Sequence, residues 1–482
     1  MAEEIYHTEM MRTMFRRVHE SISRRSLLLL IALALIVQPN LPAQAPQSTN
    51  GTNAGPDWLT QPLSLSDALY VALRQNANVL RAMSDLEAAE GLAMETKAIA
   101  LPRLRGSAEY EHTEAVEEID VGDSTRLESP KDEWSGNIRI RQPIYQGGRL
   151  KAALRTAKLT REEALMFYYA AVADSLLEVR TGYYDVLLAE QQILVHEAEV
   201  KLLSEELQNT TRRFEAGAVP RFDVLRGEVA VANAKPRLIR ARNSHRIAKN
   251  RLATLLGYNI PAMVWEDIPM TLTDRLHADP YKVELPTAIA QALARRPELS
   301  ALQKSVDLRK ERVRAAKSER KPWFGIFAGY DARNSQFSER FNDAVSGPIA
   351  GVEMTWDIWD SGATKGRVRQ AEAFVTKAEV ALDDTMRRVE QEVRTAYSRF
   401  IEAQETLESQ AKVQERAQES LRLAISRYDA GTGTQLDVLD AQTALTEASA
   451  TQVEALRNYL VARAELERAI GQDIPAIKEG KR

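Results

Sequence analysis

The chain carries one helix-breaking motif twice, and this repetition limits the possible fold more than any other feature. Both copies read A-G-x-x-x-x-x-D-V-L, with Gly217 and Gly431 in second position, 214 residues apart. Asp437 follows Asp223 at the same spacing. Because equal spacing of matched residues marks an internal duplication, the chain is predicted to fold as two copies of one plan. Each motif is predicted to form a tip, meaning the tight turn between two helices.

The rest of the sequence fits two repeats, at 63–257 and 285–471, joined by an irregular connector at 258–284. In each repeat we expect a helix, a β-hairpin, a long helix, the tip and a return helix. Pro102 and Pro322 are predicted to end the first helices, because proline cannot continue a helix. The hairpins are placed at about 103–145 and 322–359, and the tips at about 214–222 and 428–437.

Inside each predicted hairpin the hydrophobic period changes from about 3.6 residues to two. In 134–142 and 350–358 the even positions are almost all apolar, whereas the odd positions carry most of the polar side chains. Such alternation is typical of strands with one apolar face. Strands of about 10 residues are long enough to cross a membrane when tilted. A soluble sheet packed on helices would alternate in the same way, so the pattern leaves both interpretations open.

Two proline-free stretches, 149–214 and 365–428, predict very long helices. Each has about 65 residues, so each helix would extend over roughly 100 Å. Apolar side chains in these stretches and in the return helices recur at alternating steps of three and four residues, as in coiled coils. Examples are Leu165, Tyr169, Val172, Leu176, Val179, Tyr183 and Val186. Helices of this length predict a rod or a tube.

The N-terminus predicts export. Arg24 and Arg25 precede an apolar run of about 11 residues, and an A-x-A site ends at Ala45. This pattern is typical of a secretory signal peptide, here 1–45, with an N-terminal membrane anchor as the alternative. A flexible lead at 46–62 and a short tail at 472–482 complete the chain. Beyond Val37 no run of 18 apolar residues occurs, so only strands could place the mature chain in a membrane.

Composition argues against several classes of function. The net charge of −4 favours neither a nucleic-acid surface nor an acidic tail. With no cysteine, the chain has no disulfides and no thiolate metal ligands. The six histidines are scattered, and neither H-E-x-x-H nor G-x-S-x-G occurs. We therefore expect neither an enzyme nor a bound cofactor or metal.

The number of strands predicts an oligomer. A closed membrane barrel needs at least about eight strands, and an open sheet edge in lipid leaves backbone groups unsatisfied. Since one chain supplies four clear strands, two chains would give eight and three would give twelve. The residues alone establish only that more than one chain is needed.

The duplicated plan and above all the two tips resemble the outer-membrane efflux protein (TolC-like) family, over about residues 63–471. The resemblance implies a mainly α fold with a small β part. It implies a homotrimer with a 12-stranded transmembrane β-barrel in the outer-membrane lipid, continued by a long periplasmic α-helical barrel. Such a protein is the exit duct of a tripartite efflux or type I secretion system, with a periplasmic adaptor and an inner-membrane pump as partners. The alternative is a secreted structural coiled-coil or adhesin-like rod, which needs no apolar hairpins.

Asp437 and Asp440 are candidate constriction residues. They lie three residues apart on a helix and hence on one face, so symmetric copies would form two rings of carboxylates. The resemblance implies that both match the narrowest point of the family's channel. Asp437 also lies three residues after Thr434, where it could serve only to cap the helix. Asp440 lies too deep in the helix for that role.

The remaining site assignments come from the resemblance. Tyr428 matches a position that helps to hold the tip closed. Adaptor contacts are expected at the tip turns, at Gly217, Ala218, Asp223, Gly431 and Thr432. The family often has an arginine where this chain has Gly433. Either Arg427 or Arg221 is a candidate local substitute for that arginine.

Overall fold

The computed structural model describes residue 59 and residues 61–113, 118–120, 126–128, 132–258, 267–334 and 343–472. All of them belong to the unit Asp57–Arg482. The predicted signal peptide, most of the predicted lead and nearly all of the predicted tail lie outside these residues.

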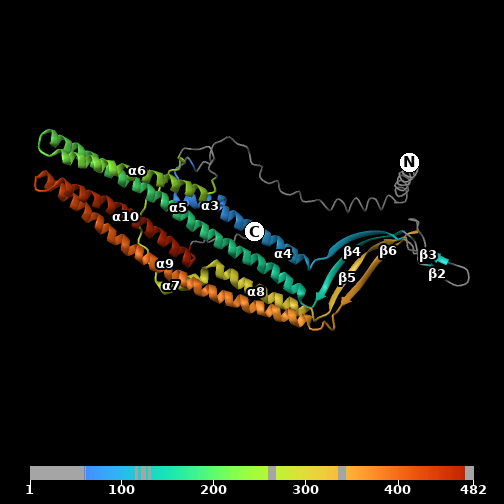
Figure 1. Ribbon diagram of the computed structural model, residues 1–482. Coiled ribbons are helices and arrows are strands. Elements are labelled where there is room, and N and C mark those ends of the chain that lie inside the picture. The colour runs from blue at the N-terminus through green and yellow to red at the C-terminus, as the bar shows by residue number, and fades with distance from the viewer. Residues whose placement is uncertain are drawn as a thin grey trace, which may run out of the picture. The chain divides into compact units, whose positions relative to one another are not determined.

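The two halves of the chain contain the same order of elements (Figure 1). The first half contains α3 (Leu65–Gln75), α4 (Ala77–Ala98), β1 (Arg103–His112), β4 (Asp132–Gln146), α5 (Arg149–Glu215) and α6 (Arg221–Leu255). The second half contains α7 (Leu285–Arg295), α8 (Pro297–Ser318), β5 (Trp323–Arg333), β6 (Val345–Thr355), α9 (Ala363–Asp429) and α10 (Gln435–Ile470). A small pair, β2 (Glu118–Asp120) and β3 (Arg126–Glu128), lies between β1 and β4. Within the described part of the chain, no helix combines the length and apolar character that crossing a membrane requires.

The expected single helices at the start of each repeat are wrong, because each is broken into two. Asn76 ends α3 and caps α4: its Oδ1 accepts a hydrogen bond from the Asn78 N–H at 2.8 Å. Its amide nitrogen donates to the Leu255 carbonyl at 2.7 Å, which fixes the bend against α6. In the second half the break falls at Arg296, since the following Pro297 disfavours a helical conformation at that residue.

The four long strands form one antiparallel sheet in the order β1-β4-β5-β6. Up to the bulge after Pro143, its register pairs even-numbered residues with even-numbered ones, as in Tyr110 with Trp134 and Ile138 with Tyr330. Because residues directly opposite each other share a face, the apolar positions of all four strands line up on one side. Strand β4 also continues through Pro143, with a bulge before Tyr145, into residues predicted to form the junction with the helix.

The apolar face of the sheet is exposed. Large apolar side chains from all four strands stand open on it: Leu104, Tyr110, Ile138, Ile140, Ile326, Tyr330, Val352 and Met354. A soluble sheet would cover such a face with helices, because a contiguous apolar surface is unfavourable in water. The structure therefore favours the lipid-facing interpretation of the alternating pattern. The opposite face is polar and carries an ion pair between Arg139 and Asp331.

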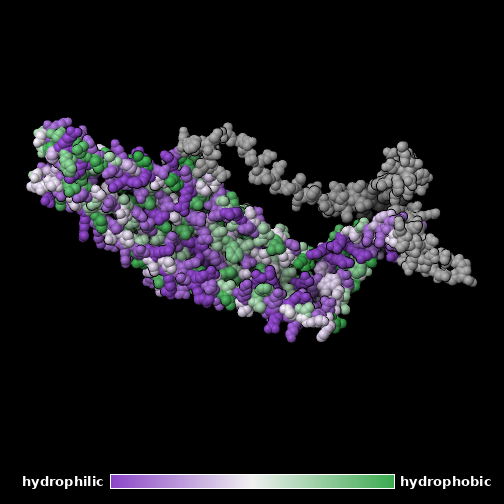
Figure 2. Space-filling view, viewed as in Figure 1, coloured by the Kyte–Doolittle hydropathy of each residue, from purple (hydrophilic) through white to green (hydrophobic). Residues whose placement is uncertain are grey.

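The helices continue the order of the strands. Next to the sheet, α4, α5, α8 and α9 lie side by side in the same sequence as β1, β4, β5 and β6 (Figure 1). Towards the tips the order is α6, α5, α10 and α9. On the face that Figure 2 shows, hydrophilic residues cover most of the long helices. The long helices α5 and α9 thus link each hairpin of the sheet to one tip.

Two apolar clusters hold the middle of the helical layer. In the first, Val179, Tyr183 and Val186 of the predicted coiled-coil seam are buried against α3 and α6. In the second, Phe400 of α9 packs against Tyr459 of α10, with ring centroids 5.4 Å apart.

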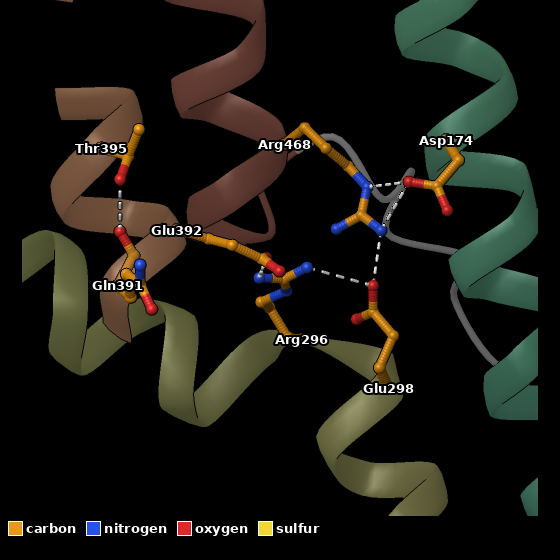
Figure 3. A network of polar contacts seen from close by, with 7 residues as sticks. All are labelled: Asp174, Arg296, Glu298, Gln391, Glu392, Thr395 and Arg468. Atoms are coloured by element: carbon orange, nitrogen blue, oxygen red, sulfur yellow. Dashed lines mark hydrogen bonds and ion pairs between the residues drawn. The ribbon is translucent and has the colours of Figure 1, made fainter. Parts of the chain in front are cut away.

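An ionic joint built on two buried arginines connects the end of α10 to the start of α8 (Figure 3). The guanidinium of Arg468 contacts Glu298 at 2.5 Å and Asp174 of α5 at 2.6 Å. Arg296 in turn contacts Glu298 at 3.3 Å and Glu392 of α9 at 2.5 Å. Burial opposes the charge of Arg468, but the two carboxylates outweigh it and raise the pKa of Arg468 above its usual value. The joint therefore ties four helices together where α10 ends.

Candidate functional site: the paired tips

Both tips turn on a glycine in the left-handed backbone region, with φ of 74° at Gly217 and 73° at Gly431. The Ala218 N–H donates to the Arg213 carbonyl at 2.8 Å, and the Thr432 N–H donates to the Arg427 carbonyl at 2.9 Å. These bonds satisfy the last carbonyls of the long helices. A Cβ atom at either glycine would meet no atom within 4 Å, so the backbone conformation, and not space, requires glycine there.

The structure places Asp437 in the first turn of α10, where it forms a capping box with Thr434. Its Oδ2 accepts bonds from the backbone N–H and the hydroxyl of Thr434, each at 2.9 Å. These bonds lower the pKa of Asp437, first through the backbone N–H and then through the hydroxyl. The carboxylate is nevertheless exposed, so Asp437 caps the helix and also presents a charge at the surface. The counterpart Asp223 lies in the first turn of α6, where the preceding Pro220 provides no side-chain cap.

Asp440 lies one turn further along α10 and is exposed. Among the described residues, neither a hydrogen bond nor an ion pair engages its side chain. Asp440 therefore contributes nothing evident to the turn itself. Two exposed carboxylates consequently lie close together at the start of α10, where hydrated cations could approach them.

Tyr428 is buried within the protomer, in contrast to the two aspartates. It packs with Leu421 of α9, Val438 of α10 and Leu202 of α5. Its hydroxyl is fully buried and has no hydrogen-bond partner among the described residues. The ring of Tyr428 therefore fills the space between the two tips.

Arg213 is a residue of the tip that the sequence did not assign to the site. Its Nη2 donates to the Asp429 carboxylate at 2.7 Å, and its guanidinium carbon lies 4.6 Å from the centre of the Tyr428 ring. Arg427 and Arg221, the substitutes expected from the sequence, are both exposed. The repeat could have drawn attention to Arg213, because it lies 214 residues before Arg427 at the start of the duplicated motif.

The turn itself explains why glycine stands at position 433. A Cβ atom there would lie 3.1 Å from both the Arg427 Cβ and the Tyr428 backbone nitrogen, closer than most side-chain contacts. The Gly433 N–H also donates to the Arg427 carbonyl at 3.0 Å. An arginine at this position would have to displace the end of α9.

Further along the chain, the seam between α5 and α10 joins the two repeats through polar groups. The Gln435 amide donates to the Thr210 hydroxyl at 3.1 Å, and both residues are buried. Nearer the sheet, Arg457 contacts Asp185 at 2.6 Å and Arg180 contacts Glu467 at 2.9 Å. Within the described ranges, acidic and histidine side chains form no cluster of three or more that could hold a metal ion.

The fold and the paired tips define a class of duplicated helical protein whose sheet has one exposed apolar face. The sequence matches the family described as "Outer membrane efflux protein" over residues 68–258 and 288–472, so the chain belongs to that family. It is therefore a TolC-like outer-membrane protein.

The sequence aligns with curated relatives over most of their length. The chain is 25% identical over 413 residues to the alkaline protease secretion protein AprF of Pseudomonas aeruginosa, covering 84% of this chain and 83% of AprF. It is 23% identical over 437 residues to the outer membrane protein TolC of Escherichia coli, covering 87% and 85%. It is 25% identical over 457 residues to the cobalt-zinc-cadmium resistance protein CzcC of Cupriavidus metallidurans, covering 93% and 100%.

Solved structures show the same fold. The outer membrane channel CmeC of Campylobacter jejuni superimposes with a TM-score of 0.70 at 14% identity, covering 86% of this chain and 87% of CmeC. CusC superimposes with a TM-score of 0.69 at 18% identity, covering 90% and 98%. The expected mainly α fold with a small β part is therefore confirmed for the single chain.

Proposed function

We propose that three copies of this chain form one exit duct, which carries solutes from an inner-membrane pump across the periplasm and the outer membrane. The observation that carries the proposal is the exposed apolar face of the four-stranded sheet together with its two outer strands. In the described chain, β1 pairs only with β4 and β6 pairs only with β5. Open edges are costly in lipid, because their backbone groups have no water to bond. Three copies would join these edges into a barrel of twelve strands.

The outer helices support the same closure. Exposed apolar side chains occur on both edge helices of the layer next to the sheet: Leu80, Met83, Leu92 and Met94 on α4, and Phe374, Val380 and Met386 on α9. Removal of such apolar surface from water favours association. Contact between α4 of one copy and α9 of the next would cover both rows. The helices would then continue the barrel as a tube.

The tips would close this tube. In a threefold arrangement, Asp437 and Asp440 would each appear three times around the axis as two rings of carboxylates. Such rings attract cations and oppose the passage of anions. Tyr428, buried in each protomer, would hold the tips that carry these rings.

The tip turns are also the proposed contact with a periplasmic adaptor. Ala218 and Thr432 are exposed at the two turns, next to Gly217 and Gly431. The relatives named for protease secretion and for cobalt-zinc-cadmium resistance differ in cargo. We therefore assign no cargo to this chain and no catalytic step.

Because the chain has no cysteine, the adaptor contact is open to a direct test. Single variants Ala218→Cys and Thr432→Cys would be labelled with a photoreactive maleimide in cells. Both should crosslink to an adaptor, whereas Ser66→Cys, exposed at the start of α3, should not. Equal crosslinking at all three positions would contradict contact at the tips.

Membrane extraction separates the duct from the alternative of a secreted rod. A barrel in lipid leaves the membrane fraction only with detergent, since its apolar face must stay covered. A rod would be released by carbonate or high salt. Release without detergent would refute the proposed duct.

A further inference from the structure

We infer that a pocket at the junction between the sheet and the long helices binds anions inside the duct. This inference rests on the proposed exit duct, in which the polar face of the sheet becomes the lining. The pocket has a volume of 540 Å³ and lies between the start of α5, the end of α8, the start of β5 and the end of β6 (Figure 1). Its ligand would be a phosphate or carboxylate group of a solute in the duct.

The register of the strands fixes the face on which the pocket opens. Trp323 lines the pocket and lies directly opposite Thr355, which lines it as well. Both are odd-numbered, like Asp331 further along β5, which forms the ion pair on the polar face. Because alternate residues of a strand share a face, the pocket opens on the side away from the apolar surface. A ligand would therefore come from the water of the duct and not from lipid.

The lining of the pocket carries more positive than negative charge. Three of its side chains are cationic, Arg149, Lys321 and Arg367, and two are acidic, Glu319 and Asp357. Arg367 and Glu319 neutralise each other in an ion pair of 2.6 Å. Among the described residues, neither an ion pair nor a hydrogen bond engages the side chains of Arg149 and Lys321. Two cations are therefore left to attract an anion, against one carboxylate.

Uncharged groups of the lining offer further hydrogen bonds. The Trp323 ring lies close to Gly325, where a Cβ atom would be 3.0 Å from it. Within the described part of the chain its indole N–H has no partner, and this group only donates, so it suits an anion. Gln146 also lines the pocket, and its side-chain oxygen is buried without a partner. Half a turn of this amide would direct its NH2 group to a bound anion.

The second repeat shows that the junction does not need this charge. Arg149 begins α5, and the residue 214 positions later is Ala363, which begins α9. Gln146 corresponds in the same way to Asp360, whose carboxylate accepts bonds from two N–H groups at the start of α9. The same strand-to-helix junction thus forms with an acid and without the arginine. The cation of Arg149 is therefore available to a ligand.

Because the chain has no cysteine, a single thiol can report on the pocket. Thr355→Cys places the thiol in the pocket, and Ser107→Cys places it on the polar face of β1 as a control. Each protein, purified from membranes in detergent, would be labelled with a negatively charged methanethiosulfonate in tripolyphosphate or in chloride at equal ionic strength. At Thr355→Cys, tripolyphosphate should slow labelling about fivefold more than chloride, as expected for repulsion between two charges about 4 Å apart in water. At Ser107→Cys the two salts should give the same rate.

Substitutions of the cations identify the site. Arg149→Gln together with Lys321→Gln should abolish the difference between the two salts at Thr355→Cys. Arg105→Gln removes an exposed cation from the polar face of β1 and should leave the difference intact. If the double variant fails to assemble, each single variant decides: a smaller difference supports the pocket, and an unchanged difference at both contradicts it.

The labelling does not depend on conduction, so its outcomes separate the pocket from the duct. A conducting protein in which both salts slow the labelling of Thr355→Cys equally would overturn the pocket alone. An equal effect of tripolyphosphate at Ser107→Cys would also overturn it, because the anion would then act on the whole polar face. A protein that forms no channel but shows the expected difference would overturn the duct alone.

Discussion

At the residue scale, one carboxylate at the tip can serve two purposes. Asp437 caps α10 through a single oxygen, and its charge remains exposed. The capping interpretation and the ring interpretation of the sequence are therefore compatible. Asp440 has no structural partner among the described residues, which leaves the charge itself as its most direct contribution.

The lowered pKa of Asp437 predicts how cation block depends on pH. Bonding to Thr434 favours the charged form, so the carboxylate stays ionised below its ordinary value of 3.8. Its capping contribution is fully present above pH 3.8 and is lost as the pH falls through the lower folded value. In an Asp440→Ala protein, block of the channel by multivalent cations should persist at pH 5. Loss of that block between pH 7 and pH 5 would contradict this prediction, because it would mean that the group responsible for the block is protonated well above pH 3.8.

The buried hydroxyl of Tyr428 leads to a second prediction. Because it has no hydrogen-bond partner among the described residues, Tyr428→Phe removes no bond and should leave the conductance unchanged. Tyr428→Leu removes the ring beneath Arg213 and should raise the conductance. If Tyr428→Phe alone opened the channel, a hydrogen bond of the hydroxyl would have to hold the tip instead.

At the element scale, the helices are held together more firmly at the ionic joint than at the tips. Arg468 and Glu298 in the joint are 8% and 23% exposed, whereas Arg213 and Asp429 of the tip pair are 30% and 55% exposed. Exposed ion pairs contribute about 0.2–1 kcal/mol, but removing one partner of a buried pair costs about 3–5 kcal/mol. The tips can therefore separate while the ends of α8 and α10 stay joined.

This difference predicts the stability of two variants. Arg468→Met leaves the partly buried Glu298 with Arg296 as its remaining cation and should destabilise the protein by about 2 kcal/mol. Arg422→Ala breaks an exposed pair with Glu419 and should leave the stability almost unchanged. Thermal unfolding followed by circular dichroism would compare them. Similar midpoints for the two variants would refute a firm joint at Arg468.

The elements show how far the sequence could predict the fold. Hydrophobic period and proline positions indicated the strands and the long helices, because both patterns are local. The bend at Asn76 was missed, since the helical pattern of apolar residues continues across it. The bend at Arg296 could have been predicted from Pro297, which disfavours a helical conformation at the preceding residue. Asn76 is fixed there by a bond to Leu255, 179 residues away, which no local pattern reveals. The partners of Arg213 were missed for the same reason: they depend on how α5 packs beside α9 and α10.

At the scale of the whole molecule, the single chain is incomplete as a membrane protein. Its sheet exposes apolar side chains on one face, and β1 and β6 each lack a second partner within the described chain. In the proposed duct, further copies would pair the strand edges, and lipid would cover the apolar face of the closed barrel. Because the strands and the helices next to them follow the same order, one arrangement of neighbouring copies would complete both the barrel and the tube.

The native mass of the protein purified from membranes in detergent tests this closure most directly. Mass photometry or native mass spectrometry should find three copies in each particle, and those particles should form channels in planar bilayers. A monomer that stays soluble without detergent would contradict the central claim that three chains share one duct.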